Sequence, residues 1–197
     1  MLLWEAMDKL FGLPAHPLLV HIPIVLLPLA MLGAVAIAVR PAWRRRYGWL
    51  VLAVTVAGTI GAVLAANAGD SLEEQVGRSV QVRDHAREGE MARNISLGFV
   101  VLVAAYVIGA WLLERRRTST VGASGQKTAP RWVVPVLAAV MVVGGAGSLY
   151  SIVKAGHSGA KATWRDKGGD QPPPGTRGLE SPDNQQRVRR RVRADSR

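Results

Sequence analysis

The 197-residue chain contains no cysteine, which excludes disulfide frameworks, thiolate metal sites, iron–sulfur clusters and cysteine nucleophiles. It also lacks the P-loop, GxSxG and HExxH motifs of nucleotide-binding proteins, serine hydrolases and zinc proteases. Charged residues make up 20% of the chain, yet Asp, Glu, Lys and Arg are absent from four long stretches. A soluble domain of this length distributes its charges among all its elements, so these gaps exclude that class.

The charge-free stretches are four apolar runs, at residues 17–39, 48–68, 95–113 and 132–153. At about 1.5 Å per residue, each run is long enough to cross roughly 30 Å of hydrocarbon as a helix. The runs are too long and too continuous for the strands of a membrane barrel. The sequence therefore predicts an all-α fold, an integral membrane four-helix bundle that occupies residues 17–165.

Small residues indicate how the spans approach one another. They let helix backbones come close in lipid, and they gather in the second and fourth runs: Gly58, Gly61, Ala62, Ala65, Ala66, Gly144, Gly145, Gly147 and Ser148. In the first run, Pro23 and Pro28 each remove a backbone donor, which predicts a bend.

The two ends of the chain differ from the bundle. Residues 1–16 lack the basic start of a signal peptide and place Leu3, Met7, Leu10 and Phe11 on one helical face. This pattern predicts a short helix in the membrane interface, with an ordinary turn as the alternative. The basic tail over residues 166–197 reads as disordered. No aromatic residue follows Trp164 to stack on a base, so nucleic acid is not an expected partner.

Four spans place both termini on the same side as the loop expected over residues 69–94. Basic residues near the span ends are balanced between the two sides, but the first run has Lys9 before it and several arginines directly after it: Arg40, Arg44, Arg45 and Arg46. The first helix usually sets the orientation. We therefore expect a multi-pass protein of a bacterial plasma membrane with both termini outside the cytoplasm.

All four histidines belong to that same side: His16, His21, His85 and His157. Imidazole suits iron, copper and zinc, and it is an axial ligand of haem. This convergence predicts a cofactor site that holds a b-type haem or a transition metal, with a redox role. The expected ligands are His21 with either His85 or His157, and His16 serves as a further ligand or supports them. In the alternative metal set, Glu88 joins His21 and His85.

Other interpretations stay open. Each histidine also has an ordinary reading, as a helix start, a solvated side chain or part of a mobile tail. The chain is then a structural or accessory membrane subunit without a cofactor, bound to a partner through its small-residue faces. The expected protein partner is a membrane redox partner or a second copy of the chain. A permease is the least supported class, because His21 is the one ionisable residue within the runs. No enzyme substrate site is expected.

The stretch LPAHPLLVHIPIVLLPLA, residues 13–30, resembles the start of the bacterial membrane family known as domain of unknown function 2231. The likeness rests on His16, Pro17, His21 and Pro23, and it extends over about residues 10 to 165. Further similar features are Gly69-Asp70, His85, and Gly156-His157 with Gly159; Ile22 stands where the family has an aromatic residue. The resemblance implies four spans and a set of histidines that act together, but no defined activity.

Overall fold

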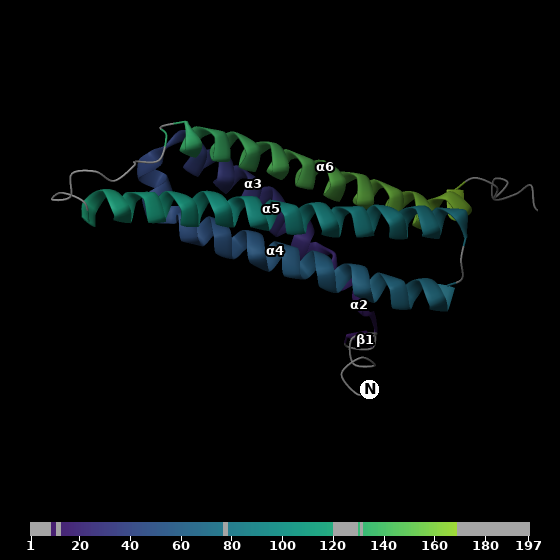
Figure 1. Ribbon diagram of the computed structural model, residues 1–197. Helices are drawn as coiled ribbons and strands as arrows, with labels where there is room; N and C mark the ends of the chain where they lie inside the picture. Colours follow the sequence, from purple (N-terminus) through teal and green to yellow (C-terminus); the bar gives the residue numbers. More distant parts are fainter. Residues whose placement is uncertain (1–8, 11–12, 77–78, 120–129, 131, 169–197) are drawn as a thin grey trace, which may run out of the picture. The chain divides into compact units, whose positions relative to one another are not determined.

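The computed structural model describes residues 9–10, 13–76, 79–119, 130 and 132–168. Within these ranges, four long helices form a bundle (Figure 1): α3 (His21–Val39), α4 (Pro41–Val76), α5 (Val80–Ser119) and α6 (Val133–Gly168). A short helix, α2 (Ala15–Leu19), and two short strands, β1 (Lys9–Leu10) and β2 (Leu13–Pro14), precede them. The predicted all-α four-helix bundle is confirmed.

Contacts divide the chain into two units, Met1–Ala160 and Lys161–Arg197. The first unit contains β1, β2, α2 to α5 and most of α6, and all contacts described below lie within it. The tail predicted over residues 166–197 lies outside the described residues, apart from the last turn of α6. Its disorder therefore stays a prediction.

The end of the leader is extended rather than helical. Strands β1 and β2 pair antiparallel, with Lys9 opposite Pro14 and Leu10 opposite Leu13. A proline disfavours the helical conformation in the residue before it, which accounts for the extended backbone of Leu13. The predicted interfacial helix is therefore wrong at this end, and residues 1–8 lie outside the described part of the chain.

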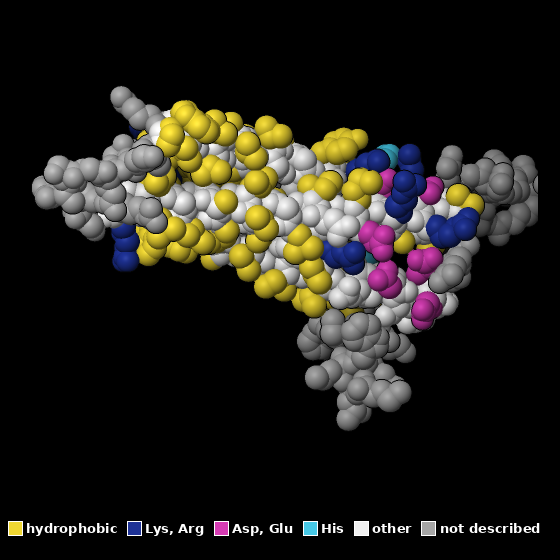
Figure 2. All heavy atoms as spheres, viewed as in Figure 1, with side chains coloured by type: hydrophobic (Ala, Val, Ile, Leu, Met, Phe, Trp, Pro, Cys, Tyr) yellow, Lys and Arg dark blue, Asp and Glu magenta, His cyan; other side chains and the backbone are white. Residues whose placement is uncertain are grey.

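Helices α4, α5 and α6 are longer than a bilayer requires. They contain 36, 40 and 36 residues, or about 54 to 60 Å at 1.5 Å per residue, against roughly 30 Å of hydrocarbon. All four predicted runs, apart from Trp132, lie within helices that are long and apolar enough to span a membrane. Most of the excess length lies at one end of the bundle, where charged side chains gather next to the histidines (Figure 2).

Much of that excess comes from residues 69–94, which are not the open loop expected from the sequence. Helix α4 continues to Val76 and α5 already begins at Val80. Along the start of α5, Val82 and Ala86 are partly buried whereas Arg83 and Arg87 are exposed. Such an alternation forms an amphipathic helix without a long apolar run, so a search for apolar runs misses it.

Glycines allow close contact between the helices, as the small residues predicted. A β-carbon at Gly61 of α4 would overlap Ile22 of α3, and one at Gly144 of α6 would overlap Leu102 of α5. A β-carbon at Gly145 of α6 would overlap two side chains, Met31 of α3 and Phe99 of α5. Large side chains therefore fill the space that the missing β-carbons leave.

Hydroxyl groups join three helices in the buried interior. Thr59 of α4 donates to the backbone oxygen of Ser96 on α5 at 3.3 Å, and the Ser96 hydroxyl donates to Ala92 O at 2.7 Å. Since the Ser96 proton is used there, the 3.2 Å bond between Ser96 and Ser148 of α6 is donated by Ser148. These three hydroxyl groups are thus satisfied within the bundle.

At the end away from the histidines, Arg44 connects α4 to α5. Its guanidinium donates to Glu114 Oε1 at 2.6 Å and to the Tyr106 hydroxyl at 3.5 Å. Tyr106 is 1% exposed and donates in turn to the backbone oxygen of Ile37 in α3 at 3.1 Å. Arg44 is therefore a structural residue as well as part of a basic segment.

We predict that Gly145→Val destabilises the bundle, because the added methyl groups need space that Met31 and Phe99 occupy. Overpacking of this kind costs about 1–3 kcal/mol. Gly98→Val is the matched control, since a β-carbon there meets nothing within 4 Å. Thermal unfolding in detergent should show a lower midpoint for Gly145→Val than for Gly98→Val; equal midpoints would contradict the close contact.

Candidate functional site

The histidines lie on four different helices at the charged end of the bundle (Figure 2). His16 belongs to α2, His21 begins α3, His85 lies near the start of α5, and His157 lies in α6. His16 and His85 are partly buried, whereas His21 and His157 are exposed. The convergence on one end agrees with the sequence, but the four side chains do not share one environment.

His16 is fixed by the backbone of α4. Its Nδ1 lies 2.7 Å from the carbonyl oxygen of Ala65. A carbonyl can only accept, so Nδ1 carries the proton and donates. A β-carbon at Gly69, one turn further along α4, would lie 3.1 Å from the His16 ring. Two residues of α4 therefore set the tautomer and the position of this imidazole.

His85 is fixed in the same way by α6. Its Nδ1 lies 3.1 Å from Ser158 Oγ, and Ser158 Oγ donates its own proton to Ala155 O at 2.8 Å. The serine oxygen must then accept, so His85 donates through Nδ1. A β-carbon at Gly159 would lie 2.9 Å from Cε1 of the His85 ring, so only glycine fits at this position without a shift of the ring.

The two imidazoles are in contact. Their ring centroids lie 5.8 Å apart, and the ring planes meet at 77°, an edge-to-face arrangement. Because both Nδ1 atoms donate, both Nε2 atoms are left with a lone pair. The pair formed by His16 and His85, called here the histidine pair, therefore offers two nitrogen ligands from helices far apart in sequence.

His21 and His157 do not take part in this contact. Val20, the single residue between α2 and α3, has helical backbone angles of φ −62° and ψ −22°. The chain thus stays nearly helical from His16 to His21, and five helical positions turn the second ring well away from the first. The structure pairs His85 with His16, to which the sequence had given a secondary role, and not with His21.

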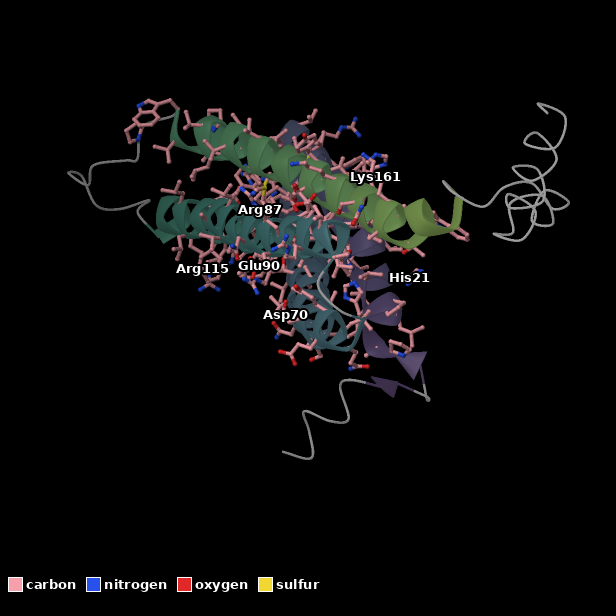
Figure 3. The ribbon with its side chains drawn as sticks, turned by 90° about the vertical axis from the view of Figure 1, so that its right-hand side faces the viewer. His21, Asp70, Arg87, Glu90, Arg115 and Lys161 are labelled. Atoms are coloured by element: carbon pink, nitrogen blue, oxygen red, sulfur yellow. The ribbon has the colours of Figure 1, made fainter. Side chains whose placement is uncertain are left out.

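The acidic residues nearby make other contacts. Glu88 pairs with Lys154 Nζ of α6 at 2.8 Å, and Asp70 and Glu90, which Figure 3 labels, are exposed. No group of three His, Asp or Glu that could hold a metal ion occurs among the described residues. The predicted metal set of His21, His85 and Glu88 is therefore not assembled, because His21 is exposed and Glu88 is engaged by the lysine.

A haem does not fit the histidine pair. Two axial imidazoles lie on opposite faces of a porphyrin, with the iron between their nitrogens. In the pair, the edge of one ring meets the face of the other, and Gly69 and Gly159 close on the rings from α4 and α6. This arrangement leaves no room for a flat macrocycle between the rings.

Sequence reasoning missed the residues that fix the two rings. Ala65 acts through its backbone, and Ser158 acts through a hydroxyl that is common in any sequence. Gly69 and Gly159 carried a signal, since both belong to the family resemblance. Their role is to leave room for an imidazole, and it appears only when α4 and α6 are placed beside α2 and α5.

The pKa of His85, which lies outside the apolar run 95–113, is lowered from its usual value by burial and by the neighbouring His16. A hydrogen bond with the Ala155 backbone raises the pKa and so opposes this shift. A lowered pKa in the folded state means that the unfolded chain binds the proton first as the pH falls. The contribution to stability is thus complete above about pH 6.5 and is lost below it.

We therefore predict that the thermal midpoint of the detergent-purified protein falls between about pH 8 and about pH 5, and that His85→Gln reduces this dependence. His157→Gln is the control, because that side chain is exposed and its removal should leave the dependence unchanged. A profile that is identical in the two variants would show that His85 does not contribute.

Comparison with known proteins gives a family and no further relative. The family model described as "Predicted membrane protein (DUF2231)" matches residues 12–172. No curated protein and no solved structure matches the chain. The matched region covers every helix described above, including the histidine pair and both glycines beside it. The chain belongs to the DUF2231 family of predicted membrane proteins.

Proposed function

We propose that this membrane protein binds one transition-metal ion at the histidine pair. The observation that carries the proposal is that the two rings are in contact and that each Nδ1 lies within hydrogen-bond distance of an oxygen. These oxygens assign the proton to Nδ1 and leave Nε2 unprotonated. Metal-bound histidines usually donate their other nitrogen to a carbonyl or a similar acceptor, which fixes the tautomer. Imidazole nitrogen favours zinc, copper, nickel or iron over magnesium or calcium.

Two protein ligands leave the remaining coordination positions to water or to groups of a partner. Such an ion is accessible and exchanges more readily than one in a closed four-ligand site. This agrees with the position of the histidine pair among charged residues at the end of the bundle and outside the apolar runs. A redox role depends on which metal binds, and copper or iron would supply it.

The test is a titration of metal-stripped protein in detergent with Zn²⁺ and, separately, with Cu²⁺. We predict about one ion per chain, lost in His16→Gln and in His85→Gln because each removes one of two ligands. His21→Gln and His157→Gln serve as matched controls and should keep the ion. Thermal midpoints of all four variants would separate a loss of binding from a loss of folding.

Two results would contradict the proposal: binding that survives in the double variant of the pair, or no stoichiometric binding at all. The absorption spectrum is recorded on the same samples. A haem band that disappears in His21→Gln would return the site to the ligands expected from the sequence.

A second candidate function is that of a structural or accessory subunit. It is favoured by the same hydrogen bonds, because His16 ties α2 to α4 and His85 ties α5 to α6. Metal-free protein in which both substitutions at the pair only lower the unfolding midpoint would support this alternative. Crosslinking in membranes that returns one stoichiometric partner would extend it.

We further propose a bacterial plasma membrane location with both termini outside the cytoplasm. The support is the basic end of the bundle: Arg40 directly precedes α4, Arg45 and Arg46 lie in the first turns of α4, and α5 reaches Arg115 at the same end. Basic residues next to span ends favour the cytoplasmic side. We predict that alkaline phosphatase, which is active only outside the cytoplasm, is active when fused after residue 168 and inactive when fused within residues 120–129; the reverse result would invert the orientation.

A further inference from the structure

A groove lies between α3 and α4 at the basic end of the bundle. It has a volume of about 580 Å³ and is lined by Leu29, Ala30, Gly33, Ala36, Ile37, Trp43, Tyr47, Leu50, Val51 and Val54. Leu29 and Leu50 are 53% and 60% exposed, so the groove opens onto the outside of the bundle. All these residues lie in or next to the first two apolar runs, and a surface at that depth faces lipid chains.

The volume is typical of ligand pockets, and the lining is apolar apart from the tips of Trp43 and Tyr47. Tryptophan and tyrosine favour the boundary between hydrocarbon and headgroups. Their position next to the start of α4 places one end of the groove at that boundary, while Leu29 and Val54 extend it toward the middle of the membrane. The groove therefore runs from the headgroup region into the hydrocarbon.

Positive charge lies at the headgroup end. The guanidinium of Arg40 lies 5.1 Å from the ring centroid of Trp43, and that of Arg46 lies 5.5 Å from the ring centroid of Tyr47. Each arginine is thus held against an aromatic ring that lines the groove. Both are exposed, and a guanidinium over an aromatic face can still donate to an anion through the N–H groups in its own plane.

Arg44 does not belong to this charge. It is directed to Glu114 and Tyr106 on the α5 side of α4, where its charge is largely compensated. The sequence RRR at residues 44–46 therefore divides between two functions. One arginine holds two helices together, and Arg46, with Arg40, stands beside the groove.

We propose that this groove binds an anionic phospholipid, with one acyl chain along α3 and α4 and the phosphate against Arg40 and Arg46. Apolar length, an aromatic pair at the boundary and two arginines next to it match the three parts of such a molecule: chain, glycerol region and charged headgroup. A bilayer leaflet supplies this ligand at high concentration. A soluble phosphate lacks the chain and would leave the groove unfilled.

The test uses the full chain in nanodiscs of phosphatidylcholine to which phosphatidylglycerol is added, with bound lipid measured by native mass spectrometry after release. We expect the wild-type chain to retain phosphatidylglycerol in preference to phosphatidylcholine. The double variant Arg40→Gln, Arg46→Gln should lose this preference by roughly 30-fold, the loss expected for two arginines near an anionic surface. Arg45→Gln is the matched control and should change it little.

A second variant tests the apolar part. Ala36→Phe places a ring in the groove and should lower the retention of both lipids, while Ala53→Phe, at an exposed position of α4 outside the groove, should not. Unfolding midpoints of all variants are also measured in one detergent, so that a misfolded chain is recognised.

Three outcomes would overturn the proposal. Equal retention of the two lipids by the wild-type chain would show no site for an anion. A preference that survives in the double arginine variant would place the anion elsewhere. Displacement of phosphatidylglycerol by inorganic phosphate alone would identify a phosphate site without a role for the groove.

Discussion

Backbone amide and carbonyl groups inside a bilayer have no water to bind, and this constraint determines most of the structure. It requires continuous helices across the hydrocarbon. Because lipid chains are as apolar as the side chains, burying one apolar side chain against another stabilises the bundle little. The helices must then associate through close packing and internal hydrogen bonds. Gly61, Gly144 and Gly145 supply the first, and Thr59, Ser96 and Ser148 supply the second.

The two ends of the bundle differ in how they satisfy polar groups. At the basic end, one ion pair between Arg44 and Glu114, with Tyr106, joins three helices within a short distance of the membrane boundary. At the other end, the helices continue into water, and the histidine pair forms where they still pack together. A site built there has the rigidity of the membrane bundle and access to ions from solution.

The sequence predicted the spans well because a span depends on local composition. A run of about 20 apolar residues without charge can be recognised wherever it occurs in the chain. The extended helices of residues 69–94 were missed because amphipathic helices outside the lipid leave a weaker pattern. The sequence predicted at which end of the bundle the histidines lie, but not which of them are in contact. Which histidines meet depends on the rotation of α2, α3 and α5 about their axes, and the sequence suggested His21 where the structure places His16.

The histidine pair joins chain segments that a ribosome makes at very different times. His16 on α2 is synthesised before His85 on α5, and both are synthesised before Ser158 and Gly159 on α6. The His85 ring therefore stays without its serine acceptor until the fourth helix has been inserted and has docked. A chain in which α6 has not yet docked therefore differs from the folded bundle by an uncovered His85 imidazole.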